Sequence, residues 1–327
     1  MDSVYNPLKI LHHIDSYKCG RPVYAQVDLV NVCNHHCIRC SELYHESFRL
    51  KDRLSSEMVM SFLSDFYDLG GKAIEWTGGG EPLLSPIFPE SALRALELGL
   101  ECGLITNGEL MKESHVLILE RFKYVRVSVD AVTVDMFQGL RGIHSDLSHV
   151  GRIVGWLRGR VLLGASFIIQ PENYQEIFPF AKWVRDIGYD NVRFSFVWTP
   201  QGTRVLLPYR GAIKEQVLKA KELETDEFCV FAQEERLVNV WDPRRYRHCY
   251  YSDLTIALAA NGKLYHCCTW KSNPLGEWGD LNLYPLSYWW EKKLVVDAQK
   301  CPPCWMDKKN EAMGYLLLES PAHVNFV

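Results

Sequence analysis

Cysteine is the residue type in this chain with the greatest capacity for chemistry. The 327 residues include 11 cysteines, an odd number, and they are unevenly placed. A disulfide framework is therefore a poor interpretation. Three cysteines form one cluster and four more lie late in the chain, a distribution that indicates metal sites: Cys33, Cys37 and Cys40, then Cys249, Cys267, Cys301 and Cys304.

The first cluster has the spacing C-x-x-x-C-x-x-C directly after a β-rich run. Three thiolates on one loop can hold three irons of a cubane cluster and leave the fourth iron free for a small molecule. A zinc knuckle is the alternative, with His35, His36 or His45 as the fourth ligand. The spacing alone leaves both open.

The second set runs from Cys249 over twelve residues to Gly262, over four more to Cys267, and later to Cys301-Pro-Pro-Cys304. Four thiolates converging across a hairpin suit either a structural zinc ribbon or an iron–sulfur cluster. Cys268 adjoins Cys267 on a predicted strand and should point to the opposite face. Either of the two could therefore be the ligand.

Between residues 23 and 198, β-rich runs alternate with helical periodicity, which predicts βα units and a parallel sheet. Side chains at the C-terminal ends of such strands face the ligand crevice, in a doubly wound sheet and in an incomplete barrel alike. The predicted strands are 23–30, 73–77, 102–106, 124–129, 161–170 and 191–198, and the predicted helices are 55–69, 86–98, 110–122, 149–158 and 174–187.

Short polar residues follow three consecutive strands. The second strand ends in a glycine-rich turn, Trp76-Thr77-Gly78-Gly79-Gly80-Glu81-Pro82, which lets backbone approach a ligand closely. The third ends in Thr106-Asn107-Gly108 and the fourth in Ser128-Val129-Asp130. We expect these groups to gather at one mouth of the fold.

After residue 198 the βα pattern stops. A charged helix is predicted at 212–225, and a hairpin at 254–259 and 263–267 with its turn at Asn261-Gly262. The predicted division is an N-terminal segment (1–22), the α/β domain (23–200), a connector (201–245), a small cysteine-bearing domain (246–310) and a tail (311–327).

The composition excludes several classes of protein. With 47% hydrophobic and 23% charged residues the chain is globular, and a net charge of -4 without long charge runs argues against nucleic acid or an anionic membrane as partner. No apolar run approaches the ~20 residues of a membrane-spanning helix. The N-terminus lacks a secretion signal pattern, so we expect a cytoplasmic protein.

Taken in order, these motifs resemble the radical S-adenosylmethionine (SAM) superfamily over residues 23–198: C-x-x-x-C-x-x-C, Gly79-Gly80-Glu81, Thr106-Asn107-Gly108, Ser128 with Asp130, and Arg141-Gly142. The resemblance implies an α/β fold, a partial (β/α)6 barrel, with a [4Fe-4S] cluster whose open iron binds SAM. It also implies reductive cleavage of SAM to a 5′-deoxyadenosyl radical that abstracts a substrate hydrogen, with electrons from a flavodoxin- or ferredoxin-type donor.

The resemblance further implies a set of SAM contacts. Gly78, Gly79, Gly80 and Glu81 would contact the methionyl amino group, Ser128 and Arg141 would hold its carboxylate or the ribose, and Thr106, Asn107 and Gln170 would line the same pocket. One position departs from the family pattern, because Arg39 stands where an aromatic residue usually precedes the third cysteine. An arginine can stack on adenine in its place.

The late cysteines are similar to the short "twitch" form of the SPASM extension of radical SAM enzymes. This implies a small C-terminal iron–sulfur domain with one auxiliary [4Fe-4S] cluster on Cys249, Cys267, Cys301 and Cys304, since no cysteine follows Cys304. The four-residue spacing from Gly262 favours Cys267 over Cys268. Four cysteines saturate the cluster, which points to electron transfer or structural support.

The leading hypothesis is therefore two-electron oxidation of an alcohol on a polar small molecule, such as a sugar, cyclitol or aminoglycoside-like compound. Asp130 is the expected proton acceptor. The second hypothesis is a redox-neutral isomerase or epimerase, acting on a small molecule or peptide, with a cysteine hydrogen donor such as Cys268. A non-enzymatic zinc scaffold is the third.

Overall fold

The computed structural model describes residues 6–44, 51–199, 203–232, 244, 246–271, 275–301, 304 and 306–317. The predicted connector (201–245) and tail (311–327) lie partly outside these ranges, and His45 lies wholly outside them.

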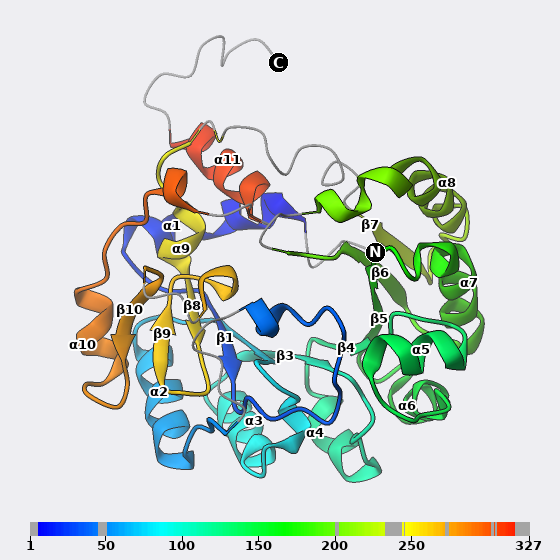
Figure 1. Ribbon diagram of the computed structural model, residues 1–327. Coiled ribbons are helices and arrows are strands. Elements are labelled where there is room, and N and C mark those ends of the chain that lie inside the picture. The colour runs from blue at the N-terminus through cyan, green and yellow to red at the C-terminus, as the bar shows by residue number, and fades with distance from the viewer. Residues whose placement is uncertain are drawn as a thin grey trace.

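Within these ranges ten strands form one curved sheet in the order β10-β9-β8-β1-β2-β3-β4-β5-β6-β7. The sheet curls into an open barrel (Figure 1). Neighbours from β1 to β7 pair in parallel, which confirms the predicted partial barrel. The strands are β1 (Tyr24–Asp28), β2 (Ala73–Thr77), β3 (Glu101–Thr106), β4 (Tyr124–Ser128), β5 (Leu162–Ile169), β6 (Asn191–Phe196), β7 (Cys229–Ala232), β8 (Thr255–Leu258), β9 (Lys263–Tyr265) and β10 (Glu277–Asp280).

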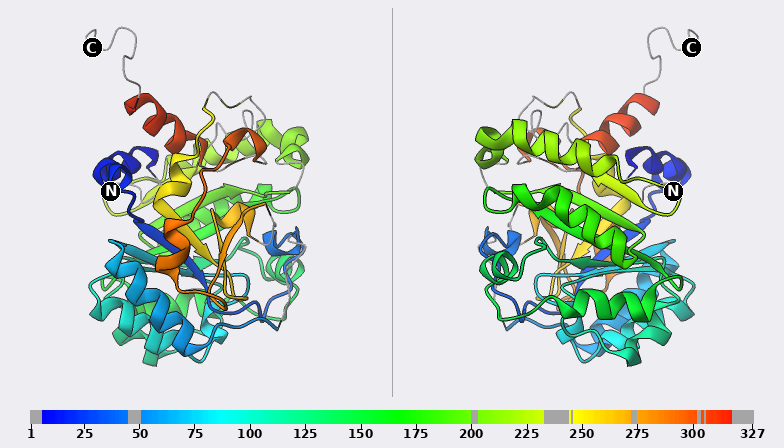
Figure 2. Two further views of the ribbon diagram at one scale, coloured as in Figure 1. Left: turned by 90° about the vertical axis from the view of Figure 1, so that its left-hand side faces the viewer. Right: turned by 90° about the vertical axis from the view of Figure 1, so that its right-hand side faces the viewer.

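Helices cover the outer face of this sheet and its open side (Figures 1 and 2). They are α1 (Ile14–Lys18), α2 (Ser56–Asp68), α3 (Phe88–Glu97), α4 (Val116–Leu119), α5 (Val134–Arg141), α6 (Ser148–Leu157), α7 (Ile177–Ile187), α8 (Arg210–Lys221), α9 (Tyr250–Leu254), α10 (Leu286–Glu291) and α11 (Asp307–Leu316). The helices α1, α9, α10 and α11, outside residues 23–198, were not predicted, and within that range two helices differ from expectation. The helix predicted at 110–122 is reduced to a 3-10 turn and the short α4, and α5 was not predicted.

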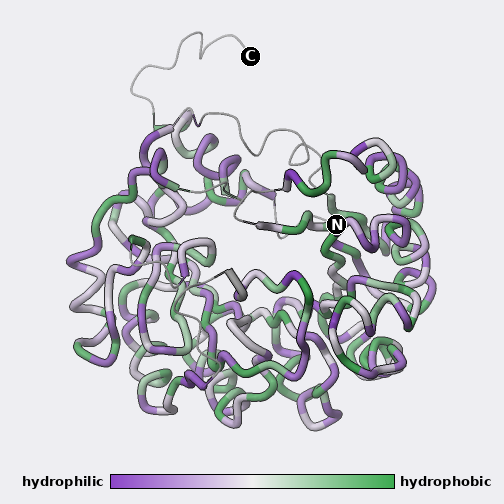
Figure 3. Tube along the Cα trace, in the orientation of Figure 1, coloured by the Kyte–Doolittle hydropathy of each residue, from purple (hydrophilic) through white to green (hydrophobic). Residues whose placement is uncertain are grey.

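Local sequence explains the regular elements. The Ser55 side chain caps α2 by accepting a hydrogen bond from the amide of Met58 at 3.2 Å. The buried residues of α2 then recur at helical spacing, at Val59, Phe62, Leu63 and Phe66. Hydrophobic and hydrophilic residues alternate along the outer helices accordingly (Figure 3).

The strands of the barrel bury apolar side chains on their outer face and turn polar ones inward. On β4, Val125 and Val127 are fully buried in the main core. Their neighbours Tyr124, Arg126 and Ser128 instead line a cavity inside the barrel. Successive residues of β4 thus face the core and the cavity in turn.

The C-terminal hairpin continues the barrel sheet. The turn predicted at Asn261-Gly262 joins β8 and β9, and Gly262 has a φ of +84°, which favours glycine. Strand β8 pairs in parallel with β1, at the edge opposite β7. The cysteine-bearing segment is therefore attached directly to the strand that leads into the first cysteine cluster.

The open side of the barrel is occupied by the N-terminal helices and α11 (Figure 1). Ile10 and Val23 pack there with Tyr251, Leu254 and Met313 in a second, smaller core. None of the described helices combines the length and apolar character required to span a bilayer.

Candidate active site

The first cysteine cluster lies in the loop after β1, and two neighbours hold the backbone of this loop. On one side the amides of Gly80 and Glu81 donate to the carbonyls of Val30 and Val32, both at 2.9 Å. On the other side the loop amide of His36 donates to the carbonyl of Arg141 at the end of α5, at 2.8 Å. The cysteine loop is thus clamped between the glycine-rich turn and α5.

Two glycines make this clamp possible. A Cβ on Gly80 would lie 2.0 Å from the carbonyl oxygen of Val32, and a Cβ on Gly142 would lie 2.6 Å from that of His36. Gly142 also has a φ of +61°, a conformation that other residues adopt at a cost. The Gly-Gly-Glu and Arg-Gly motifs therefore have a packing function against the cysteine loop, which reasoning from sequence had missed.

Glu81 joins the ends of two strands to the same loop. Its carboxylate accepts hydrogen bonds from the Thr106 hydroxyl at 2.6 Å and the Asn107 amide at 2.8 Å. The Asn107 side chain in turn donates to the Asn34 side chain of the cysteine loop at 2.8 Å. Burial raises the pKa of Glu81, and these hydrogen bonds oppose the shift. One buried carboxylate therefore links the Gly-Gly-Glu motif to the Thr-Asn-Gly motif, and through Asn107 to the cysteine loop.

Arg141 and Asp130 form a buried ion pair beside Cys37. The guanidinium lies 2.8 Å from one Asp130 oxygen and donates to the Cys37 sulfur at 3.6 Å. The other Asp130 oxygen accepts from the Ile168 amide at 2.7 Å. Burial raises the pKa of Asp130, and Arg141 opposes this shift. Since both oxygens are engaged, the arrangement suits positioning of Arg141 more than proton transfer.

A cavity of about 720 Å³ fills the barrel below the cysteine loop. Its size is typical of small-molecule sites. Arg39 lines this cavity and forms an ion pair with Glu172. The predicted site residues that meet there are Cys37, Arg39, Cys40, Ser128, Asp130, Arg141, Gln170 and Cys268. Six other predicted residues are not among those that line this cavity, and their contacts with SAM stay predictions: Gly78, Gly79, Gly80, Glu81, Thr106 and Asn107.

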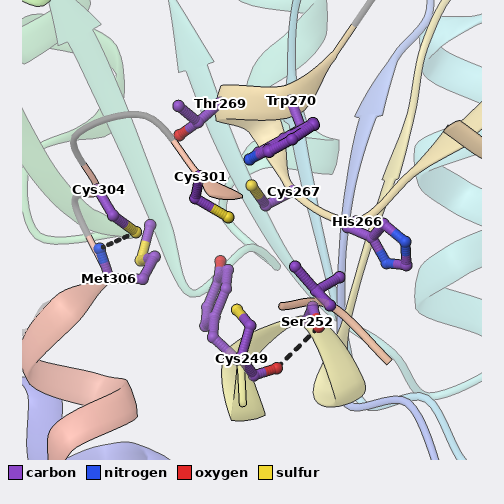
Figure 4. A pocket seen from close by; sticks show the side chains of 11 residues that line it. Cys249, Ser252, His266, Cys267, Thr269, Trp270, Cys301, Cys304 and Met306 are labelled. Atoms are coloured by element: carbon purple, nitrogen blue, oxygen red, sulfur yellow. Dashed lines mark hydrogen bonds between the residues drawn. The ribbon is translucent and has the colours of Figure 1, made fainter. Parts of the chain in front are cut away.

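The four late cysteines surround a second, separate pocket. Cys249 precedes α9, Cys267 follows β9, and Cys301 and Cys304 lie between a 3-10 turn and α11. Figure 4 shows their sulfur atoms turned toward a common space. Three segments that are distant in sequence therefore converge on one all-sulfur site.

The environment of these thiols favours a bound cationic centre. Burial raises the pKa of all four, to about 11 for Cys301. A metal centre would supply the positive charge that keeps them as thiolates. Among the described residues no three His, Cys, Asp or Glu side chains lie close enough to hold a single ion. The four thiols line one pocket, and four cysteine thiolates are the ligand set of a [4Fe-4S] cluster.

Cys267 and Cys268 face different spaces, as their alternation predicts. Cys267 lies in the four-cysteine pocket, whereas Cys268 lines the barrel cavity. Tyr251 and Met306 line both spaces, so they form a shared wall. The four-cysteine pocket and the barrel cavity are therefore separated there by a single layer of side chains.

A buried charge cluster that the sequence reasoning missed connects the two cysteine regions. Lys271, just after Cys268, lies 2.6 Å from an oxygen of Asp28 at the end of β1 and 3.2 Å from one of Glu42 after the first cysteine cluster. All three charged residues are buried. No local signal could have revealed the contact, because 243 residues separate its partners.

Two inward arginines and a glutamate were missed as well. Arg126 on β4, Arg193 on β6 and Glu75 on β2 all line the barrel cavity. The Glu75 carboxylate accepts hydrogen bonds from the Gln26 side chain at 2.7 Å and from the Tyr124 hydroxyl. Their signal was present, since charged residues at inward positions within apolar strands are unusual.

Curated relatives match about half of the chain. An Fe-coproporphyrin III synthase of Methanosarcina barkeri is 29% identical over 170 residues, which are 51% of this chain and 41% of that protein. A probable GTP 3′,8-cyclase of Saccharolobus islandicus is 24% identical over 53% of this chain and 56% of its own length. The chain thus spans about half the length of the curated relatives that it matches.

Solved structures share the fold over more of the chain. Streptococcus suis SuiB bound to S-adenosylmethionine superposes with a TM-score of 0.67 at 14% identity, over 95% of this chain and 79% of that one. The enzyme anSMEcpe, bound to AdoMet and a peptide, gives a TM-score of 0.63 at 14% identity, over 90% and 95%. At these identities the likeness shows the fold alone.

The family model described as the radical SAM superfamily matches residues 27–199, which contain the end of β1, the cysteine loop, the glycine-rich turn and β2 to β6. Enzymes of this family use a [4Fe-4S] cluster together with SAM. Of the three loop thiols, those of Cys37 and Cys40 line a cavity of suitable size, which fits that cofactor pair. The family match, the motif order and the fold agree, and the chain belongs to the radical SAM superfamily.

Proposed function

We propose that this enzyme abstracts a hydrogen atom from a polar small molecule bound in the barrel cavity and oxidises one of its alcohols to a carbonyl. Cys33, Cys37 and Cys40 would hold the cluster that, with SAM, supplies the 5′-deoxyadenosyl radical. Cys249, Cys267, Cys301 and Cys304 would hold a saturated auxiliary cluster. The hydroxyl-bearing substrate radical would lose one electron to that cluster and one proton to a base.

The observation that carries this proposal is the shared wall. Tyr251 and Met306 line both the barrel cavity and the four-cysteine pocket. An electron leaving a substrate radical therefore has an acceptor site one side-chain layer away. The donor set supports the same role, since four cysteines leave no open iron for direct binding of substrate.

Cysteine variants test the assignment of both sites. In anaerobically reconstituted protein, Cys37→Ala should abolish formation of 5′-deoxyadenosine from SAM. Cys301→Ala should lower the iron content by up to about four atoms per chain and suppress carbonyl product. Cys19→Ser changes an exposed thiol outside both sites and is the matched control. SAM cleavage by the wild type without any carbonyl product from sugars or cyclitols would contradict the oxidation.

Asp130 was the predicted proton acceptor, and its geometry now supports a different expectation. Both carboxylate oxygens are engaged, by Arg141 and by the Ile168 amide. Asp130→Asn should therefore slow SAM cleavage by displacing Arg141 next to Cys37. If the variant instead cleaves SAM normally but fails to release carbonyl product, Asp130 is the base after all.

A second candidate function is a redox-neutral isomerisation or epimerisation. The placement of Cys268 in the barrel cavity, beside an auxiliary ligand, favours it. A thiol there could return a hydrogen atom to the substrate radical. Turnover in D2O would then introduce one deuterium into the product, and Cys268→Ala would stop turnover while SAM is still cleaved. Carbonyl product from Cys268→Ala at the wild-type rate would exclude this candidate.

We further propose a flavodoxin- or ferredoxin-type protein as the external electron donor, and the cytoplasm as the place of action. The free thiols are compatible with a reducing compartment.

A further inference from the structure

We propose that Lys293 holds a positive charge behind the four-cysteine pocket and raises the reduction potential of the auxiliary cluster. Lys293 is a positioning residue in this role, because it acts through the cluster and not on the substrate. The inference rests on the proposed function in one respect, since it takes the four late cysteines as the ligands of that cluster. It goes further by naming a residue outside the ligand set that controls how readily the site accepts an electron.

The ammonium group of Lys293, two residues after α10, is enclosed by neutral groups. It donates hydrogen bonds to the carbonyl oxygen of Ser252 and, at 3.0 Å, to that of Thr255. It also lies 4.8 Å from the ring centre of Trp278 and 4.3 Å from that of Trp290. Carbonyl oxygens and the faces of aromatic rings both attract a cation. These surroundings therefore suit a positively charged side chain.

The same contacts place Lys293 directly behind the four-cysteine pocket. Ser252, whose carbonyl accepts a hydrogen bond from Lys293, lines that pocket (Figure 4). The hydroxyl and the amide of Ser252 both donate to the carbonyl of Cys249, at 2.8 and 3.1 Å. Lys293 is not among the residues that line the pocket. It therefore stands one residue behind the ligand Cys249, close enough to act by its charge.

The charge of Lys293 is retained in this position. Lys293 as a whole is half-buried, and burial lowers the pKa of its ammonium group to about 7. The negative charges of Asp253, Cys249 and Cys267 oppose this shift. Cysteines that ligate a metal centre are thiolates, so they carry more negative charge than free thiols do. Ligation of a cluster therefore strengthens the attraction and keeps Lys293 protonated.

A second cation beside the cysteines has its charge balanced by a direct ion pair. Arg244 donates to the carbonyl of Cys301 at 2.8 Å, and it pairs with Asp307 at 3.2 Å. The direct partners of Lys293 are neutral carbonyls and rings instead. More of the charge of Lys293 than of Arg244 therefore remains to act on the cluster.

A positive charge at this position favours the reduced form of the cluster. Reduction adds one negative charge, and the potentials of iron–sulfur clusters respond to nearby charge and to solvent exposure. The attraction is stronger in a partly buried setting than in water. In the proposed oxidation the substrate radical loses one electron to the cluster and its hydroxyl proton to a base as the carbonyl forms. A higher potential makes the cluster a better acceptor of that electron.

A redox titration of the reconstituted holoenzyme, followed by electron paramagnetic resonance, tests this inference. The signal that is missing from Cys301→Ala identifies the auxiliary cluster. Lys293→Gln removes the charge and keeps a hydrogen-bond donor. Its midpoint potential should fall by about 59 mV, the shift that corresponds to a tenfold change in a one-electron equilibrium. Lys293→Arg keeps the charge and should stay close to the wild-type potential.

Lys292→Gln is the matched control. Lys292 is the exposed neighbour of Lys293, and its ammonium group lies 4.8 Å from the ring centre of Tyr288. The control removes the same charge from beside an aromatic ring, and it should leave the potential unchanged because solvent screens that charge.

Three results would overturn the proposal. The first is an equal midpoint potential in the wild type and in Lys293→Gln. The second is a shift in Lys292→Gln or in Lys293→Arg as large as that in Lys293→Gln. The third is loss of the auxiliary iron from both Lys293 variants, because Lys293 would then be a structural support. If only Lys293→Gln loses this iron, Lys293→Met takes its place in the titration.

Failure of the proposed function gives a different result. A wild-type holoenzyme whose auxiliary potential depends on Lys293, but which forms no carbonyl product, would retain this inference and lose the oxidation.

Discussion

Replacing Gly80 by alanine tests whether the glycine-rich turn positions the first cysteine loop. An added Cβ would lie 2.0 Å from the carbonyl oxygen of Val32, which is backbone and cannot rotate away. An ordinary contact begins at 3.4 Å, so turn and loop must separate by roughly 1.4 Å. The displaced segment lies one residue before Cys33.

The expected effect is larger on chemistry than on folding. Overpacking of this kind costs about 1–3 kcal/mol of unfolding free energy. A displacement of about 1 Å at a reacting site can cost on the order of 100-fold in rate. Gly80→Ala should therefore stay folded by circular dichroism, yet bind less iron at the first site and form 5′-deoxyadenosine about 100-fold more slowly.

Gly155→Ala is the matched control. Gly155 lies in α6, and no atom beyond its own helix backbone stands within 4 Å of its added Cβ. This variant should gain about 0.5–1 kcal/mol of stability, because alanine loses less backbone entropy in a helix. Wild-type iron content and SAM cleavage in Gly80→Ala would refute the proposed coupling between the turn and the loop.

Three further predictions concern the supports of the same loop. Glu81→Ala leaves two buried donors at the end of β3 without an acceptor, so urea unfolding should show a free energy of unfolding lower by about 1–3 kcal/mol. A decrease below about 0.5 kcal/mol would contradict this expectation. Lys271→Met leaves the carboxylate of Asp28 buried without its cation and should lower the free energy of unfolding by about 3–5 kcal/mol. The double variant that adds Asp28→Asn should recover part of this stability. If it recovers none, the ion pair is not the cause of the loss. Gly142→Ala combines an unfavourable φ with a close backbone contact, so it should lower the thermal midpoint and the iron content together, and a fall in stability without iron loss would separate α5 from the cysteine loop.

Several features of the site could be read from residue order because their signals are local. The cysteine spacing, the glycine-rich turn and the polar residues after β3 and β4 lie within a few residues of each other. Parallel strands bring such segments to one edge of a sheet, whatever the rest of the chain does. The split between Cys267 and Cys268 was predicted as well, although the strand expected there ends at Tyr265 and Cys268 begins a 3-10 turn.

In the fold, too, the features with local signals could be predicted and those that depend on distant contacts could not. The six strands and most of the helices follow from periodicity, whereas α5 was missed because it is a single short helix of eight residues. The seventh parallel strand, β7, lies in the segment expected to be a connector and pairs with β6. Its pairing depends on hydrogen bonds to a strand some forty residues earlier, which local patterns do not encode.

The amino-acid sequence by itself determined the kind of chemistry, since three clustered thiols after a strand and four later ones limit the centres that the chain can bind. Only the tertiary structure decided how those parts are used. It joined β8 to β1, set the two cysteine sites on either side of Tyr251 and Met306, and turned Arg126, Arg193 and Glu75 into one cavity. These are contacts between residues far apart in the chain, and their energies depend on burial and charge in the folded state, which no short stretch of sequence contains.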